Sequence, residues 1–177
     1  MGHCSTEFLP LNIAVLTVSD TRTFDNDTSG QFLVDAAKGA GHNLIDRALL
    51  KDNLYDIRAK VAVWAAQDKV HVILITGGTG FTDRDSTPEA VSCLFDKTVE
   101  GFGELFRQIS FSEIGTSTIQ SRALAGISNH TLIVCLPGST NACRTAWVNI
   151  LKDQLDSQGS CNFVTHLLKK PACHSRG

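Results

Sequence analysis

Hydrophobic residues along this chain fall into four short continuous runs, separated by longer stretches in which apolar positions recur at helical spacing. The runs span residues 12–19, 44–50, 70–76 and 131–136. Continuous runs of this length, rich in Val, Ile and Leu, are typical of strands that are buried on both faces of a sheet. The pattern therefore predicts four parallel-type strands.

The segments between these runs carry apolar residues three and four positions apart, which favours helices. We predict helices over 32–40, 54–67, 88–95, 102–109 and from 140 to about 155, a further short helix over 117–125, and an edge strand over 162–168. Gly39 to Gly41 ends the first helix. The alternation of strand and helix predicts a single α/β domain over 1–177, three-layered (α/β/α) with a mainly parallel sheet. Its core spans about 12–168, and we expect flexible termini, with a disordered tail over 169–177.

The bulk composition is that of an ordinary globular protein. The 177 residues carry a net charge of -2 and are 42% hydrophobic. Such a balance gives no general attraction to nucleic acid or to an anionic membrane, so recognition of phosphate has to be local. No apolar run approaches a membrane span and no signal-peptide pattern begins the chain, so we expect a cytoplasmic enzyme or binding protein. Of the six cysteines, Cys93 and Cys135 are expected to be buried apolar residues rather than ligands.

Polar stretches follow each predicted strand. They are Ser19-Asp20, Lys51-Asp52-Asn53, Thr76 to Asp85, and Pro137 to Thr140. In an open parallel sheet, ligands bind beyond the carboxyl ends of the strands. The four stretches are therefore expected to converge on one site.

The third strand runs directly into the glycine-rich turn Thr76-Gly77-Gly78-Thr79-Gly80. A helix start follows, with Ser86 or Thr87 as N-cap and Pro88 in the first turn. The turn lacks the Lys and Ser/Thr of a P-loop and the third glycine of a dinucleotide fingerprint. One interpretation is an ordinary turn at a strand end. Asp85 and the adjoining helix start favour the other, a site for a phosphorylated ligand with a divalent cation.

Candidate chemistry rests on a pair of carboxylates. Asp52 and Asp85 follow different strands, and Mg²⁺ is typically held by one or two carboxylates together with substrate phosphates. Glu89 is predicted to form a capping box with Ser86. Ser139 lacks the surroundings of a nucleophile and is predicted to cap the last helix. The cations available for phosphate oxygens are Lys51, Arg84, Arg122 and Arg144.

Several of these segments together resemble the MoaB/Mog family of molybdenum cofactor biosynthesis proteins. The similarity extends over about residues 12–168, and the C-terminal motif is most similar to the MoaB branch. The segments are Thr76-Gly77-Gly78-Thr79-Gly80, Arg84-Asp85-Ser86-Thr87-Pro88-Glu89-Ala90, Gly101-Phe102-Gly103-Glu104, Ser121-Arg122, and Pro137 through Trp147.

The resemblance implies a molybdopterin-binding fold that assembles into homotrimers or homohexamers, and contacts with other enzymes of the pathway. Active relatives, including the corresponding domain of gephyrin, use Mg²⁺ and ATP to adenylylate molybdopterin and release pyrophosphate. By this resemblance Asp52 and Asp85 are catalytic and hold the metal. The residues implied to bind pterin and phosphate are Ser19, Asp20, Thr76, Gly77, Gly78, Thr79, Gly80, Thr87, Pro88, Arg122, Pro137, Gly138 and Ser139.

Two other functions remain open from the sequence. One is a non-catalytic molybdopterin-binding or carrier protein of the same pathway. The other is a general nucleotide hydrolase, which the missing P-loop disfavours.

Overall fold

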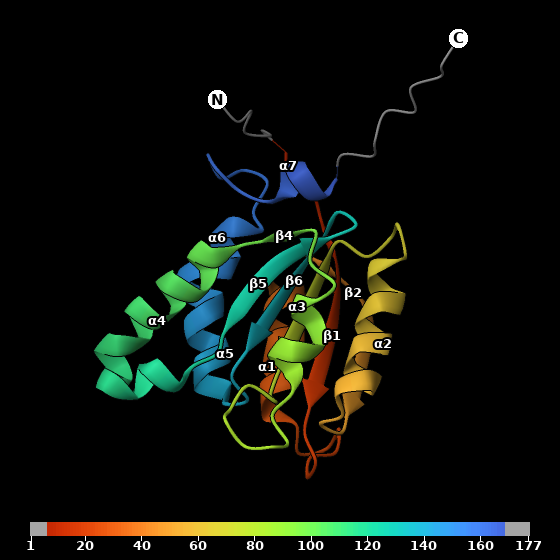
Figure 1. The fold of residues 1–177 in the computed structure, drawn as a ribbon. Helices are drawn as coiled ribbons and strands as arrows, with labels where there is room; N and C mark the ends of the chain where they lie inside the picture. The colour runs from red at the N-terminus through yellow and green to blue at the C-terminus, as the bar shows by residue number, and fades with distance from the viewer. Residues whose placement is uncertain (1–6, 169–177) are drawn as a thin grey trace.

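A computed structural model describes residues 7–168 (Figure 1). Its strands are β1 (Asn12–Val18), β2 (Asn43–Leu50), β3 (Val72–Thr76), β4 (Lys97–Thr98), β5 (Leu124–Ser128) and β6 (Thr131–Leu136). Its helices α1 to α5 are α1 (Thr28–Gly39), α2 (Leu54–Ala65), α3 (Thr87–Ser92), α4 (Glu100–Ile114) and α5 (Thr140–Ala146). The other helical segments are η1 (Gly115–Gln120), η2 (Trp147–Leu151), α6 (Lys152–Gln154) and α7 (Val164–Leu167).

The described strands form one sheet in the order β2-β1-β3-β6-β5-β4. The four strands predicted from the sequence are β1, β2, β3 and β6, and they pair in parallel. Thr17, Thr76 and Leu136 lie level with one another across β1, β3 and β6. The loops that follow these strands therefore start at the same edge of the sheet.

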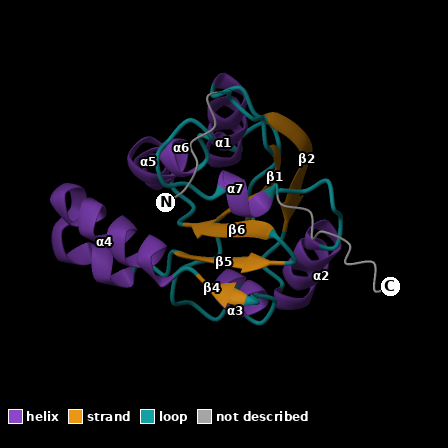
Figure 2. Cartoon of the chain, turned by 90° about the horizontal axis from the view of Figure 1, so that it is seen from above, coloured by secondary structure: helices purple, strands orange, loops and turns teal. Residues whose placement is uncertain are grey.

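Helices cover both faces of the sheet, so the predicted three-layer architecture is confirmed (Figure 2). On one face α1, α4 and α5 pack over a core that includes Leu33, Phe106 and Trp147. On the other, α2 and α3 pack over a core that includes Ile57 and Trp64. The central strands are buried on both sides, as their continuous apolar sequences require.

β5 runs antiparallel to β6, and the two form a hairpin with positive φ at Asn129 and His130. The sequence analysis missed β5 and the two-residue β4, because neither has a continuous apolar run. Both residues of β4 are exposed, and β5 reads Leu-Ala-Gly-Ile-Ser. Because β5 is antiparallel, its first residue lies at the edge where β6 ends.

Three predicted elements need correction. The helix over 117–125 exists only as the 3₁₀ segment η1, because Leu124 and Ala125 pair with β6 instead. The helix over 88–95 ends at Ser92. The edge strand over 162–168 is wrong: Val164 and Leu167, one helical turn apart, bury their side chains from the short helix α7.

The helix predicted from 140 to about 155 is confirmed, formed by α5, η2 and α6 in succession; η2 is a π-helix. Cys135 is buried as predicted, whereas Cys93 is exposed just beyond α3, so that prediction was wrong. The tail over 169–177 lies outside the described residues. Within 7–168, no helix has the length and apolar character needed to cross a membrane.

Candidate functional site

The four polar stretches predicted to converge do lie at one edge of the sheet, at the bottom of Figure 1. Hydrogen bonds join neighbouring stretches. The Asp52 amide donates to Asp20 Oδ1 at 3.2 Å, and the Gly77 amide donates to the Leu136 carbonyl at 3.0 Å. The ends of β1, β2, β3 and β6 are therefore one connected surface.

The turn after β3 has a backbone that only glycine accommodates. Gly77 and Gly78 have φ of 100° and 64°, in the left-handed region. A Cβ on Gly77 would lie 2.1 Å from the Val18 carbonyl oxygen. The turn thus passes directly against the end of β1.

Asp52 lies on one side of this turn. Its Oδ1 accepts hydrogen bonds from the Ser86 amide at 3.1 Å and from Ser86 Oγ at 2.6 Å. Its Oδ2 lies 2.5 Å from the place that a Cβ on Gly78 would occupy. The missing side chain at Gly78 is what leaves room for this carboxylate.

Asp85 lies against the same turn, two residues farther along. Its Oδ2 accepts from the Thr82 amide at 2.9 Å and from Thr82 Oγ1 at 2.6 Å, and a Cβ on Gly80 would lie 2.7 Å from it. Partial burial alone would raise the pKa of Asp85. The hydrogen bonds from Thr82 and Gly80, with the charge of Arg122, outweigh burial and lower that pKa, so the carboxylate is ionised at neutral pH.

The pair suits a divalent cation that is shared with a ligand. Within residues 7–168, no group of three or more His, Cys, Asp or Glu side chains forms a metal cluster. Mg²⁺ does not need one, because one or two carboxylates plus substrate phosphates suffice. Two half-buried aspartates beside glycines fit that requirement.

The predicted capping box between Ser86 and Glu89 does not form. Ser86 is the N-cap of α3 without a side-chain cap, because its hydroxyl donates to Asp52. Glu89 pairs instead with Arg122 Nη1.

Arg122 secures both ends of the loop that carries the carboxylate of Asp85. Its Nε donates to the Thr79 carbonyl at 3.3 Å and its Nη2 to the Asp85 carbonyl at 2.9 Å. Its guanidinium also lies 5.2 Å from the Phe81 ring centroid. Each nitrogen of this guanidinium thus has a protein partner.

The other candidate cations differ in surroundings. Arg84 forms a two-pronged ion pair with Asp20, at 3.1 Å from Nε and 2.7 Å from Nη2. Arg144 lies over the Phe32 ring at 4.8 Å, and Lys51 is exposed. Of these three cations, Arg84 is therefore the one that forms an ion pair with a predicted site residue, Asp20.

Three residues assigned to ligand binding by resemblance are buried beneath the turn. The hydroxyl of Thr76 donates to the Pro137 carbonyl at 3.0 Å, and that of Thr87 donates to the Gly77 carbonyl at 2.9 Å. Pro88 is buried beside them. The side chains of Thr76 and Thr87 thus hold the backbone of the site in place.

A cavity of about 350 Å³ lies on the other side of the turn. Thr79 and Gly80 form one wall, and the Pro137–Ser139 loop forms another. Ser139 caps α5 as predicted, its Oγ accepting from the Ala142 amide at 3.1 Å. The remaining lining comes from α4, η1 and α5: Phe106, Ser110, Glu113, Ile114, Ser117, Gln120, Ser121, Asn141, Ala142 and Thr145.

Glu113 and Ser121 are among the polar residues of this cavity to which the sequence analysis gave no role. Glu113 accepts from Asn141 Nδ2 at 2.9 Å and from Thr145 Oγ1 at 3.0 Å. The Ser121 hydroxyl is buried without any hydrogen-bond partner. A buried hydroxyl without a protein partner beside a cavity is a candidate contact for a ligand or an ordered water. The sequence offered a signal only for Ser121, through its place beside Arg122 in the motif.

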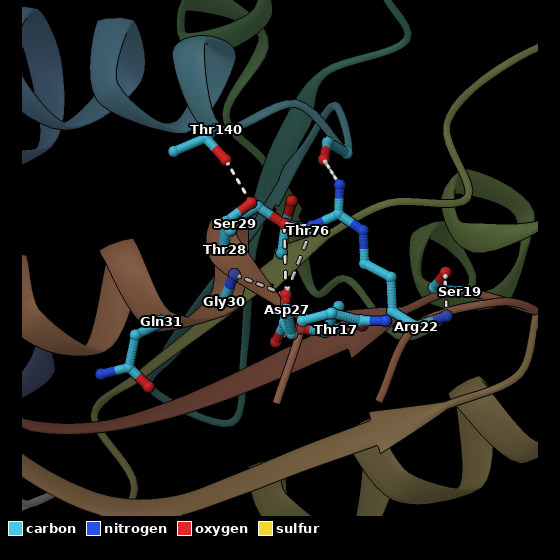
Figure 3. Close-up of polar contacts among 12 residues, drawn as sticks. Thr17, Ser19, Arg22, Asp27, Thr28, Ser29, Gly30, Gln31, Thr76 and Thr140 are labelled. Carbon is cyan, nitrogen blue, oxygen red and sulfur yellow. Dashed lines mark hydrogen bonds and ion pairs between the residues drawn. The ribbon is translucent and has the colours of Figure 1, made fainter. Parts of the chain in front are cut away.

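A second polar cluster lies at the same edge, under the start of α1 (Figure 3). Asp27 is its centre, and its side chain is fully buried. It accepts from Thr17 Oγ1 at 2.7 Å and from the Gly30 amide at 2.9 Å. Arg47 Nη2 pairs with it at 3.0 Å, and Arg22 Nη1 lies 3.6 Å away. The sequence analysis did not single out Asp27, Arg22 or Arg47.

Comparison with known proteins identifies the family. Residues 14–157 match the family described as "Probable molybdopterin binding domain". The chain belongs to this family, in its MoaB branch. It is 58% identical over 170 residues to molybdenum cofactor biosynthesis protein B of Escherichia coli strain K12, covering 96% of this chain and 100% of that protein.

Solved structures of MoaB proteins have the same fold. A crystal structure of a molybdenum cofactor biosynthesis protein B superposes with a TM-score of 0.80 at 41% identity, covering 83% of this chain and 92% of that one. The structure of the molybdopterin biosynthesis enzyme MoaB from Thermus thermophilus gives a TM-score of 0.71 at 32% identity, covering 80% and 89%. The predicted family and fold class are thereby confirmed.

Proposed function

We propose that this MoaB-family protein is a molybdopterin adenylyltransferase, which uses Mg²⁺ and ATP to form adenylyl-molybdopterin and release pyrophosphate. One observation carries the proposal: the carboxylates of Asp52 and Asp85, from loops after different strands, lie against the same glycine turn. Family membership supplies the pterin, and this pair supplies a place for a metal-bound nucleotide phosphate.

The reaction needs alignment and charge neutralisation more than a strong base. The terminal phosphate oxygen of molybdopterin attacks the α-phosphorus of ATP. A new phosphoanhydride bond forms, the bond between the α- and β-phosphates breaks, and pyrophosphate leaves with its electron pair. The nucleophile is already an anion, so catalysis depends on positioning and on stabilising negative charge.

The two sides of the turn suggest where each substrate binds. The cavity of about 350 Å³ is of the size that small-molecule sites have, and its wall contains the unpartnered Ser121 hydroxyl. We assign the pterin to this cavity. Gly80 lines the cavity and also lies beside Asp85, so a phosphate near Gly80 is within reach of both substrates' sites.

Asp52 and Asp85 would hold Mg²⁺, which when bound neutralises phosphate charge and orients the reacting groups. The protein's own contribution is to hold both carboxylates in place and to keep Asp85 ionised. Ser86 holds Asp52 and Thr82 holds Asp85. Arg122 holds the two ends of the loop from Thr79 to Asp85.

Purified chain, molybdopterin, ATP and Mg²⁺ provide the test, with pyrophosphate measured and the product identified by mass. We expect Asp85→Asn to lower turnover by about 10²- to 10³-fold, since a preorganised electrostatic group is lost. Molybdopterin affinity should stay within about threefold, because the cavity is intact. Asp83→Asn, at an exposed position in the same loop, is the matched control.

Other outcomes would identify a different function. Tight molybdopterin binding by the wild type without turnover would contradict the transferase and support a carrier. ATP cleavage that is independent of pterin would support a hydrolase.

The proposal includes assembly into homotrimers or homohexamers. Large apolar side chains stay exposed on the arm formed by α4 and η1: Phe111 is 57% exposed, Ile114 50% and Ile119 79%. Exposed large apolar side chains that share one arm are typical of an interface. Light scattering of the wild type and of Ile119→Asp tests this, with a shift to smaller particles expected in the variant.

A further inference from the structure

Arg22 bridges two loops of the site that are far apart in sequence. It lies in the loop between β1 and α1, where its backbone amide donates to Ser19 Oγ at 3.2 Å. Its side chain then extends across the edge of the sheet (Figure 3). Nη1 donates to Ser29 Oγ at 3.0 Å, and Nη2 donates to the Gly138 carbonyl at 3.4 Å.

The anchor of this bridge is the buried carboxylate of Asp27. Arg22 Nη1 lies 3.6 Å from Asp27 Oδ1, and the Ser29 hydroxyl that it contacts donates to the same oxygen at 3.3 Å. Thr17 on β1 and the Gly30 amide on α1 hold Asp27 in turn. The guanidinium is therefore fixed from below by groups on a strand and a helix.

Gly138, the residue that Arg22 reaches, is confined on its other side as well. A Cβ on Gly138 would lie 3.3 Å from the Gly77 Cα. A second link joins the same two loops, because the hydroxyls of Thr28 and Thr140 lie 2.9 Å apart. The Pro137–Ser139 loop is thus held between the glycine turn and the start of α1.

We propose that Arg22 is a positioning residue that holds the Pro137–Gly138–Ser139 wall of the cavity in its binding geometry. The assignment of that wall to molybdopterin binding rests on the proposed function. Arg22 acts through the Gly138 carbonyl, and the fork of its guanidinium suits it to contact Asp27, Ser29 and Gly138 at once. A lysine at this position has a single ammonium on a flexible stem and cannot span all three.

The neighbouring Arg47 provides a matched control. It pairs with the same carboxylate at 3.0 Å, but its Nη1 donates to Gln31 on α1, away from the cavity wall. Arg47→Gln therefore removes a cation from Asp27 without touching Gly138. Comparing it with variants of Arg22 separates positioning of the loop from general loss of stability.

The first measurement is hydrogen exchange of the full chain without ligand, in the wild type, Arg22→Lys, Arg22→Gln and Arg47→Gln. We expect the amides of residues 139–143 to exchange about tenfold faster in both Arg22 variants, the effect of one lost hydrogen bond on a local opening. Arg47→Gln should leave them within about twofold of the wild type. Equal protection in Arg22→Lys and the wild type would overturn the proposal.

The second measurement is molybdopterin binding and steady-state turnover by the same variants. In Arg22→Lys we expect the dissociation constant and KM for molybdopterin to rise about tenfold, with kcat within about threefold, because a ground-state contact is displaced. A fall in kcat with unchanged KM would contradict positioning. If the wild type itself binds no molybdopterin, the proposed function fails, while hydrogen exchange still decides the role of Arg22.

Discussion

Asp27 and Asp85 lie at the same edge of one sheet, yet their surroundings differ, and under the proposed function this difference separates a structural carboxylate from a catalytic one. Asp27 is fully buried and receives donors from β1, α1 and β2. Asp85 is half-buried and is held mainly by Thr82 in its own loop. Its Oδ2 lies beside Gly80, where a side chain would collide with it. Residue type and place in the topology are shared. Both carboxylates also lie against a glycine, Gly30 for Asp27 and Gly80 for Asp85, so what distinguishes them is burial and the origin of their donors.

The largest effect on stability is expected when the Asp27 side chain is removed. Asp27→Ala leaves Arg22 and Arg47 without their buried counter-ion, so we expect unfolding free energy to fall by about 3–5 kcal/mol. Urea denaturation measures it. Asp35→Ala, at an exposed position on α1, is the control and should change stability by about 0.5 kcal/mol or less. A loss no greater than the control's would refute the structural role.

The proposed catalytic role of Asp85 is tested by filling the space beside its carboxylate. In Gly80→Ala, the new Cβ must displace the Asp85 carboxylate, which would be 2.7 Å away. We expect kcat/KM for adenylylation to fall about 30-fold, equivalent to about 2 kcal/mol of overpacking at the site. Gly101→Ala is the control, because no atom lies within 4 Å of its Cβ position. Unchanged kinetics in Gly80→Ala would mean that the carboxylate's place is unimportant.

Acid titration sharpens the comparison by showing when each region loses its charge. Burial raises the pKa of Asp27, but hydrogen bonds from Thr17 and Gly30 and the nearby Arg47 lower it overall from 3.8. Its contribution to stability is therefore complete above that value and is lost only as pH falls through the lower folded pKa. Because the pKa of both Asp27 and Asp85 is lowered from 3.8, neither of these carboxylates changes protonation between pH 7 and pH 5.

Loss of stability in that range is expected from His42 and His71. Burial lowers the pKa of both histidines from 6.5, and their Nδ1 atoms accept from the Leu11 amide at 3.2 Å and the Asn12 amide at 3.0 Å. Below pH 6.5 the unfolded chain takes up these protons first, so each histidine should lower stability by at most about 1.4 kcal/mol per pH unit. Urea unfolding from pH 7 to pH 5 checks the slope. His42→Gln should reduce it and the double variant with His71→Gln should flatten it, whereas an unaltered slope in the double variant would assign the loss elsewhere.

The smallest effect concerns the cavity wall. Ser121→Ala removes a buried hydroxyl that lacks a protein partner, so stability without ligand should be unchanged or higher by about 1 kcal/mol. Molybdopterin affinity should fall about fivefold, from one lost hydrogen bond to the ligand. Calorimetry measures both. Ser112→Ala, whose exposed hydroxyl bonds only within α4, should leave affinity unchanged. Equal affinity in Ser121→Ala and the wild type would show that the Ser121 hydroxyl does not contact molybdopterin.

The sequence predicted the features of this edge that depend on continuous patterns. Long apolar runs identified β1, β3 and β6, and parallel topology then brought Asp52 and Asp85 to one side. Features set by long-range contacts escaped. Ser86 and Glu89 have the spacing of a capping box, but Ser86 donates to Asp52 and Glu89 pairs with Arg122 instead.

Arg22 and Asp27 were missed for a similar reason. Nothing local distinguishes them from the polar residues of any loop, and their roles arise from Thr17 and Gly138. Burial of a charged group by distant segments has no signature in a single sequence.

The antiparallel direction of β5 determines which part of the fold can change in length among relatives, namely the arm formed by α4 and η1. β5 begins where β6 ends, and the arm of α4 and η1 lies outside the sheet (Figure 2). Residues of this arm line one side of the cavity. Lengthening or shortening that arm would change the volume of the cavity without shifting the register of any parallel strand. A relative that binds a larger or smaller ligand should therefore differ from this chain first in the length of its arm. The glycine turn, Asp52 and Asp85 should stay unchanged.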